Sequence, residues 1–146
     1  MATNITTTTK LVIRSAAAAD ITAIADLIKP FVDEGSLLER TYDEFEDLLP
    51  NFFVAVDEDG TIVGCAALEI YSRKLAEIRS LAVASSVQGQ GVGRKLVEAC
   101  VARAREQNIL EIMAITASDA FFQSCGFDYT LPSLKRALFL QTRERL

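Results

Sequence analysis

The chain has 146 residues, of which 50% are hydrophobic and 24% are charged, so it is long enough to form one domain with a buried core. A net charge of −5 argues against a nucleic-acid partner, because proteins that bind nucleic acids normally carry a basic face. No apolar run reaches transmembrane length, and residues 1–10 have no apolar core of the kind a signal peptide needs. We therefore predict a cytoplasmic protein with no membrane partner, a flexible tail at residues 1–10 and a single domain at residues 11–146.

The first half of the chain predicts two helices between strands. Asp20 is a suitable N-cap for a helix, which Pro30 is expected to disturb near its end. Thr41 followed by Glu44 is a capping-box pattern for a second helix. Residues 57–60 read Asp-Glu-Asp-Gly, which is typical of a hairpin turn. The expected strands are 11–15, 52–56 and 61–71.

The second half predicts one strand–helix–strand crossover after a central antiparallel meander, and therefore a mixed sheet. A strand at 76–83 is followed by a glycine-rich loop and by a helix at 92–107 with one apolar face. The remaining expected elements are a buried strand at 109–116, a short helix that begins at Ser118 and ends before Gly126, and a last strand at 134–142.

The glycine-rich loop is the most informative stretch. Glycine lets the backbone approach a ligand closely, and a helix start leaves N–H groups without partners and carries partial positive charge. Such an arrangement binds anions, phosphate above all. Arginine at position 94 excludes both the dinucleotide fingerprint and the P-loop, each of which needs glycine there. The residues expected to hold the anion are Gln88, Gly89, Gln90, Gly91, Val92, Gly93 and Arg94.

The segment Gln-x-x-Gly-x-Gly at 88–93, preceded by Leu-Ala-Val at 81–83, resembles the acyl-CoA pyrophosphate loop of the GCN5-related N-acetyltransferase (GNAT) superfamily. The order of elements matches that family from about Leu11 to the end. The resemblance implies an α/β fold with a mixed, mostly antiparallel sheet of about six to seven strands, about four flanking helices, and a V-shaped splay between strands 4 and 5. It also implies acetyl-CoA as acyl donor.

In that family the pantetheine arm lies in the splay like an added strand. The resemblance then implies that Leu81, Ala82 and Val83 bind the arm through their backbone, and that the N–H of residue 81 or 82 polarises the thioester carbonyl. The alternative is that these side chains only fill the core. Both can hold, because the proposed binding uses the backbone.

Glu77 is the candidate general base, because a glutamate at the matching place deprotonates the amine in histone-modifying members of the superfamily. Strand alternation predicts Glu77, Arg79, Leu81 and Val83 on one face. The alternative for Glu77 is an ion pair with Arg79 or a solvated strand end, and Glu69 is the reserve candidate.

The general acid departs from the family pattern. Many members carry a tyrosine where this chain has Phe122, so the thiolate leaves with a water or another group serves. Phe121 and Phe122 are expected to pack over the cofactor. The other hydroxyl candidates are Thr116, Ser118 and Tyr129. A non-catalytic acyl-CoA sensor is the alternative that the missing tyrosine supports.

Segments 34–40, 64–68 and 76–83 look like the amino-acid N-acetyltransferase branch, the glutamate type. Arg40 and Arg79 are then candidates to clamp an acceptor carboxylate, because a guanidinium can hold one with two hydrogen bonds. The alternatives are a surface position for Arg40, paired with Glu39, Asp43 or Glu44, and a peptide or protein acceptor. The resemblance also implies a homodimer, and direct attack of a small-molecule amine on the thioester in a ternary complex.

Cysteine chemistry and metal binding are not expected. The chain has three widely spaced cysteines and no histidine, which gives no metal-ligand spacing. A thiol relay is disfavoured because no histidine is present to activate a thiol. We therefore expect free thiols and an enzyme that works without a metal ion.

Overall fold

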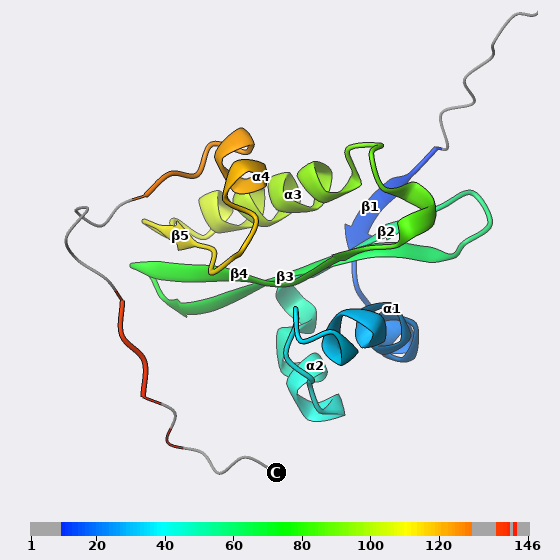
Figure 1. Cartoon of the computed structure of the whole chain (residues 1–146), viewed down its shortest axis with the longest axis horizontal. Coiled ribbons are helices and arrows are strands. Elements are labelled where there is room, and N and C mark those ends of the chain that lie inside the picture. Colours follow the sequence, from blue (N-terminus) through cyan, green and yellow to red (C-terminus); the bar gives the residue numbers. More distant parts are fainter. Residues whose placement is uncertain (1–9, 130–136, 141, 143–146) are drawn as a thin grey trace, which may run out of the picture. The chain divides into compact units, whose positions relative to one another are not determined.

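The computed structural model describes residues 10–129, 137–140 and 142. The chain divides into two compact units, residues 1–116 and 117–146, and each is described by itself. The first unit is a twisted sheet with helices on both of its faces (Figure 1). The predicted tail and the predicted single domain stay predictions.

Five strands form one sheet in the order in which they occur in the chain. The first three pairings are antiparallel, and the last is parallel because α3 crosses over between the two strands. The strands are β1 (Val12–Ser15), β2 (Phe52–Val56), β3 (Ile62–Ser72), β4 (Leu75–Val83) and β5 (Ile112–Met113). The helices of this unit are α1 (Ile21–Asp33), α2 (Tyr42–Leu48) and α3 (Val92–Glu106), with 3-10 turns at Ala18–Asp20, Leu49–Asn51 and Ser85–Val87.

The predicted mixed α/β class is confirmed, but the strand count is lower than expected. The described residues form five strands instead of six or seven. The strand expected at 109–116 is reduced to the two residues that pair with β4. Of the strand expected at 134–142, residues 134–136 and 141 lie outside the described residues, and residues 137–140 have no regular structure.

Asp20 occupies the predicted N-cap position of α1, but its side chain makes no capping hydrogen bond to that helix. Its backbone is helical there, because it also ends the preceding 3-10 turn. Its carboxylate accepts the Ala17 N–H (2.7 Å) and pairs with the Arg14 guanidinium (2.7 Å), so it closes the turn that precedes the helix. Pro30 lacks an N–H but does not end the helix, which runs on to Asp33.

Two predicted local signals are confirmed. The Thr41 hydroxyl accepts the N–H of Glu44 at 3.2 Å, which caps α2. In the β2–β3 turn the Asp57 carboxylate accepts the N–H groups of Asp59 and Thr61, both at 2.9 Å. Gly60 completes this turn with a φ of +81°, a conformation that glycine adopts without strain.

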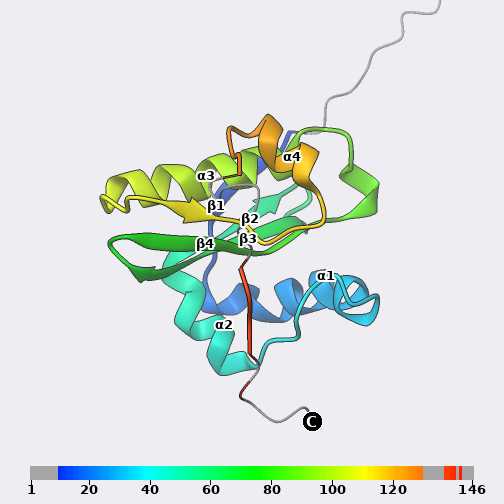
Figure 2. The same ribbon diagram turned by 60° about the vertical axis from the view of Figure 1, so that its left-hand side comes forward.

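Helices cover both faces of the sheet (Figure 2), and buried side chains lie between the helices and the sheet on each face. Helices α1 and α2 pack on one face, whose buried side chains include Ile24, Ile28, Phe45, Phe52, Val54, Cys65, Ala67 and Ala82. Helix α3 packs on the other face and buries Val92, Leu96, Val97, Cys100 and Ala104. Gly64 of β3 lets α3 approach closely, since a Cβ there would lie 3.0 Å from Leu96 Cδ1.

Strands β4 and β5 splay apart, as predicted. They pair only at Ala76 with Ile112 and at Glu77 with Met113. From residue 78 to residue 83 the same edge of β4 has no strand partner among the residues described. This leaves an open backbone edge in the middle of the unit (Figures 1 and 2).

A β-bulge lies within that open stretch. Arg79 pairs with Ala67 and Ala82 pairs with Cys65, so Ser80 and Leu81 together lie opposite one residue of β3. Ser80 is left-handed there, with a φ of +54°. Ala67 and Ala82 both belong to the α1–α2 core, so Arg79 faces that side while Leu81 faces α3. The prediction that Glu77, Arg79, Leu81 and Val83 share one face was therefore wrong, because alternation does not continue through a bulge.

Among the described residues of the second unit there is one short helix, α4 (Asp119–Ser124). The Ser118 carbonyl accepts the N–H groups of Phe121 (3.1 Å) and Phe122 (3.3 Å), which starts the helix. Gly126 follows its end with a φ of +96°. The Phe122 ring packs edge-on against the ring of Phe121 and that of Phe127, with centroids 5.1 and 5.3 Å away.

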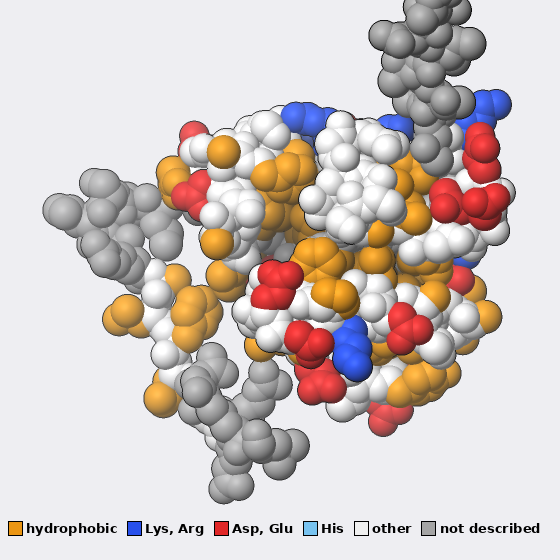
Figure 3. Space-filling view, turned by 45° about the vertical axis from the view of Figure 1, so that its right-hand side comes forward, with side chains coloured by type: hydrophobic (Ala, Val, Ile, Leu, Met, Phe, Trp, Pro, Cys, Tyr) orange, Lys and Arg blue, Asp and Glu red, His pale blue; other side chains and the backbone are white. Residues whose placement is uncertain are grey.

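The surface reflects the composition. The view in Figure 3 shows more acidic than basic side chains, in line with the net charge of −5. None of the helices among the described residues is both long enough and apolar enough to cross a bilayer.

Candidate active site

The glycine-rich loop joins β4 to the N-terminus of α3. Gly89 and Gly91 have φ values of +82° and +77°, so the loop uses two left-handed glycines to turn into the helix. The Gln88 side chain donates to the Val83 carbonyl (3.3 Å) and ties the loop to the strand. Val92, the first residue of α3, is buried and anchors the helix start. The first turn of a helix has N–H groups without intrahelical partners, which can hold an anion, so the predicted anion site at residues 88–94 stays a prediction.

The open edge of β4 supplies backbone donors. The Ala84 N–H donates to the Val63 carbonyl of β3 (2.8 Å). Because N–H groups alternate between the two edges of a strand, those of Leu81 and Val83 point to the open edge. This is also the edge toward which the Ala76 N–H points, since it donates to the Glu111 carbonyl just before β5 (3.0 Å). An extended ligand can therefore pair with β4 here, and the bulge places the Leu81 N–H beside the polar cluster described next.

The candidate base, Glu77, is buried and lies on the α1–α2 face of the sheet. The Tyr71 hydroxyl donates to its Oε1 at 2.5 Å, and Arg79 Nε lies 3.9 Å from the same oxygen. Glu69 of β3 lies directly opposite Glu77 in the strand register and pairs with Arg79 NH1 at 2.9 Å. Arg79 therefore pairs mainly with Glu69, and Glu77 is not solvated.

The candidate acceptor residue Arg40 lies in the α1–α2 loop, with a side chain that is only 7% exposed. Its Nε donates to the Ser80 hydroxyl at 2.8 Å, and its NH1 lies 3.6 Å from Glu44 Oε2. Arg40 is therefore not on the surface, but it does lie beside Glu44, one of the partners expected in the alternative, and its role as a carboxylate clamp stays a prediction. The structure thus brings Arg40 to the bulge beside Arg79, although 39 residues separate the two in the sequence.

The electrostatics of the cluster favour a negatively charged ligand at Arg40. Burial lowers the pKa of the Arg40 guanidinium, and the positive charge of Arg79 lowers it further. Burial by itself would also lower the pKa of Arg79. The hydrogen bond to Glu69 and the negative charge of Glu77 outweigh this effect, so the pKa of Arg79 is raised. Two cations held close together in a partly desolvated site attract a carboxylate, and Arg40 has the weaker anionic partner.

Sequence reasoning missed two members of this cluster, Tyr71 and Ser80. Partial desolvation of the hydroxyl, together with its hydrogen bond to Glu77, raises the pKa of Tyr71 to about 12, so the hydroxyl keeps its proton at neutral pH. The Cys65 thiol donates to the Ser80 carbonyl (3.2 Å), which holds the bulge from the β3 side. In the sequence, Glu69 and Tyr71 are two positions apart in a predicted strand, which indicates that they share a face. No feature of the sequence indicated a bulge at Ser80.

The remaining candidates fall outside this cluster. Phe121 and Phe122 belong to α4 of the second unit, so their packing over a cofactor stays a prediction. The same holds for Ser118 and Tyr129 as general acids. The described residues contain no group of three or more Cys, Asp or Glu side chains placed to hold a metal ion.

The two buried thiols, Cys65 and Cys100, are not suited to act as nucleophiles. Burial raises the pKa of Cys65 and of Cys100 to about 12. Both side chains therefore stay protonated at neutral pH, and a thiol is a poor nucleophile compared with a thiolate. This supports direct attack by the amine.

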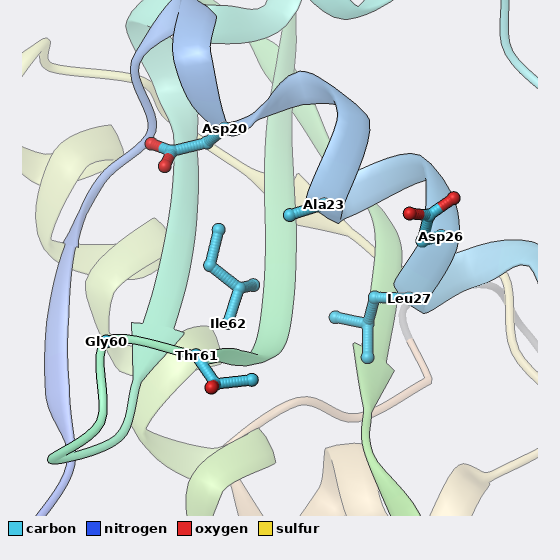
Figure 4. A pocket seen from close by; sticks show the side chains of 7 residues that line it. All are labelled: Asp20, Ala23, Asp26, Leu27, Gly60, Thr61 and Ile62. Carbon is cyan, nitrogen blue, oxygen red and sulfur yellow. The ribbon is translucent and has the colours of Figure 1, made fainter.

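A hollow of about 480 Å³ lies elsewhere, between α1 and the start of β3 (Figure 4). Its lining residues are Asp20, Ala23, Asp26, Leu27, Gly60, Thr61 and Ile62. Ile62 is seven residues from Glu69 along β3, a distance of about 23 Å in an extended strand. The hollow is therefore separate from the acid–base cluster.

Comparison with known proteins agrees with the geometry. Residues 19–127 match the model of the Acetyltransferase (GNAT) family, and the chain belongs to this family. Its enzyme class is that of the acyltransferases, and acetyl-CoA is the acyl donor. The resemblance inferred from the glycine-rich loop and the order of elements is thereby confirmed.

Several relatives carry more specific names. An uncharacterized N-acetyltransferase of Chlorobaculum tepidum is 37% identical over 79% of this chain and 74% of its own length. An amino-acid acetyltransferase of Mycobacterium tuberculosis is 31% identical over 80% of this chain and 67% of its own length. An amino-acid acetyltransferase of Pasteurella multocida is 34% identical, but this chain spans only 29% of its length.

Solved structures show the same fold. An M. tuberculosis protein in complex with CoA superposes with a TM-score of 0.77 and 30% identity, over 86% of this chain and 76% of that one. The N-acetylglutamate synthase of Neisseria gonorrhoeae, complexed with coenzyme A and N-acetyl-glutamate, gives a TM-score of 0.73 and 32% identity over 79% of this chain. This chain covers 27% of that synthase.

Proposed function

We propose that this protein transfers the acetyl group of acetyl-CoA to the α-amine of a free amino acid, with glutamate as the first candidate. The observation that carries the proposal is the buried Arg40 guanidinium beside Arg79, next to the candidate base and the open edge of β4. The names of the amino-acid acetyltransferases and the ligand of the gonococcal synthase support the same substrate class.

Acetyl-CoA binds along β4 and at the start of α3. The pantetheine arm pairs with the Val83 N–H, the Leu81 N–H is left for the thioester carbonyl, and Ala82 faces the core. The pyrophosphate lies against the N–H groups of residues 88–94, with Arg94 on the exposed first turn of α3. Phe121 and Phe122 cover the arm in this proposal.

The acceptor carboxylate binds Arg40, and Arg79 adds positive charge from the position that its pair with Glu69 fixes. Ser80 holds Arg40 by its Nε and Glu44 lies 3.6 Å from NH1, so the acceptor carboxylate would meet a guanidinium whose position is already fixed on two sides. The amine then points at the thioester carbonyl, whose oxygen is polarised by the Leu81 N–H.

Glu77 removes a proton from the acceptor amine, directly or through a water molecule, and the neutral amine attacks the thioester carbon. The tetrahedral intermediate collapses with loss of the CoA thiolate, and the proton that the nitrogen still has to lose to become the amide passes through water to the thiolate. No covalent enzyme intermediate forms. The homodimer and the cytoplasmic location expected from the sequence remain part of this proposal.

The first experiment is thiol release from acetyl-CoA with a panel of amino acids, polyamines and short peptides. Release with glutamate or another amino acid supports the proposal, and the Arg40→Ala variant should then raise the acceptor KM at least tenfold with little change in the KM for acetyl-CoA, since a charge-assisted bond is lost. Release with peptides alone refutes the amino-acid acceptor. CoA binding without release favours a sensor.

A further inference from the structure

Four side chains at the outer end of the β3–β4 hairpin form a closed network. Glu69 and Glu77 lie opposite each other, and Tyr71 and Arg79 each reach both carboxylates. Tyr71 occupies a second bulge, because Ser72 pairs with Leu75 while Ile70 pairs with Ala76. The extra residue at position 71 shifts the register so that the two glutamates face each other.

Tyr71 and Arg79 each lie closer to a different one of the two carboxylates. The Tyr71 oxygen is 2.5 Å from Glu77 Oε1 and 3.3 Å from Glu69 Oε2. Arg79 shows the opposite preference, with 2.9 Å to Glu69 and 3.9 Å to Glu77. A hydroxyl has one proton and donates it to one acceptor at a time. Arg79 therefore neutralises Glu69, and Tyr71 is left to bond Glu77.

The contacts of Glu77 are one-sided. Among the described residues, the contacts that the structure shows to its carboxylate both use Oε1. The side chain is nevertheless buried, so little water competes with the hydrogen bond that Tyr71 donates to it. The high pKa of Tyr71 keeps the hydroxyl a donor throughout the neutral range.

We infer that Tyr71 is a positioning residue for Glu77. Its hydroxyl holds Oε1 so that Oε2 is the oxygen presented to the acceptor amine, and the Glu69–Arg79 pair prevents Glu69 from competing for the hydroxyl. The inference rests on the proposed function, in which Glu77 is the base. Tyr71 does not itself touch the substrate in this arrangement.

The test removes the hydroxyl and keeps the ring, in the Tyr71→Phe variant. Because misplacing a catalytic group is costly, kcat should fall roughly tenfold to hundredfold, while the acceptor KM and the affinity for acetyl-CoA stay within about twofold. The residue is 49% exposed, so the melting temperature should change little. Tyr42→Phe is the matched control, because it removes the hydroxyl of another exposed tyrosine and should leave kcat unchanged.

A double-mutant cycle separates positioning from a structural role. If Tyr71 acts through Glu77, then Tyr71→Phe should cause no further loss in the Glu77→Gln background, measured in single-turnover reactions at high enzyme concentration. An equal loss in both backgrounds would overturn the inference, and so would a Tyr71→Phe enzyme with normal kcat. If Glu77→Gln itself has normal kcat, the base assignment in the proposed function fails instead.

Discussion

Replacing Gly64 by alanine tests how tightly β3 and α3 are packed. The added Cβ would lie 3.0 Å from Leu96 Cδ1, 3.1 Å from Val92 Cγ1 and 3.4 Å from Ala55 Cβ. Carbon atoms in contact prefer about 3.5–4.0 Å, so the side chains of α3 must retreat by about 0.5 Å. Val92 and Leu96 are fully buried, so there is no open space into which they can move.

Overpacking of a well-filled core costs about 1–3 kcal/mol. Part of this is offset, because alanine in a strand is favoured over glycine by roughly 0.5–1 kcal/mol. Leu96 meets the new Cβ with the end of a flexible side chain, whereas the β-branched Val92 is stiff at χ1. We therefore expect a net loss of about 1–2 kcal/mol in the free energy of unfolding, with the displacement concentrated at Val92.

Urea unfolding of the Gly64→Ala variant measures the loss, and titration with CoA measures its effect on the site. Since Val92 is the first residue of α3, its displacement should also raise the Kd for CoA several-fold. A Val92→Ala change in the Gly64→Ala background should recover part of the unfolding free energy relative to additivity. An unfolding midpoint that rises in Gly64→Ala, with an unchanged m value, would refute the reasoning.

Two further predictions follow from backbone conformation and from charge. Gly91 and Gly60 have φ values of +77° and +81°, so replacing either by alanine puts a residue with a Cβ in the left-handed region. Each substitution should lower the free energy of unfolding by about 1–2 kcal/mol. Calorimetry should show weaker CoA binding for Gly91→Ala and unchanged binding for Gly60→Ala. Equal CoA affinities in the two variants would contradict the placement of the pyrophosphate. The hydrogen bond from Arg14 lowers the pKa of Asp20 in the folded protein. The ionised carboxylate therefore stabilises the fold at pH values above the unfolded-state pKa of about 3.9. This stabilisation is lost as the pH falls through the lowered folded-state pKa. Asp20→Asn should therefore lower the urea midpoint at pH 7 and not at strongly acidic pH, and a pH-independent difference would contradict this reading.

The local elements could largely be predicted because their signals are local. The Thr41 cap, the Asp57 turn and the β2 strand depend on residues within a few positions of one another. The length of β5 could not be predicted in the same way. Its two paired residues are set by how far β4 and the returning chain run together, and an apolar run alone does not contain that information.

In the candidate site, too, some residues could be predicted from the sequence and others could not. Glu77, Arg79 and Arg40 were identified from sequence, and the structure brings them into one cluster. Tyr71 was missed because its contact depends on a register shift: a regular two-residue hairpin after Ser72 would have put Ile70 opposite Glu77. A bulge at a residue other than glycine leaves no mark in the composition of a strand.

The bulge at Ser80 also bears on how this strand can change in length. Without Ser80, Arg79 would still pair with Ala67, Leu81 would pair with Ala66, and Ala82 with Cys65, which gives an uninterrupted ladder with every remaining side chain on its present face. Ser80 therefore behaves as a one-residue insertion that the sheet accommodates but does not require. A chain shortened by this residue alone should keep its fold and lose the hydroxyl that holds Arg40, which separates the architecture of the sheet from the chemistry at its edge.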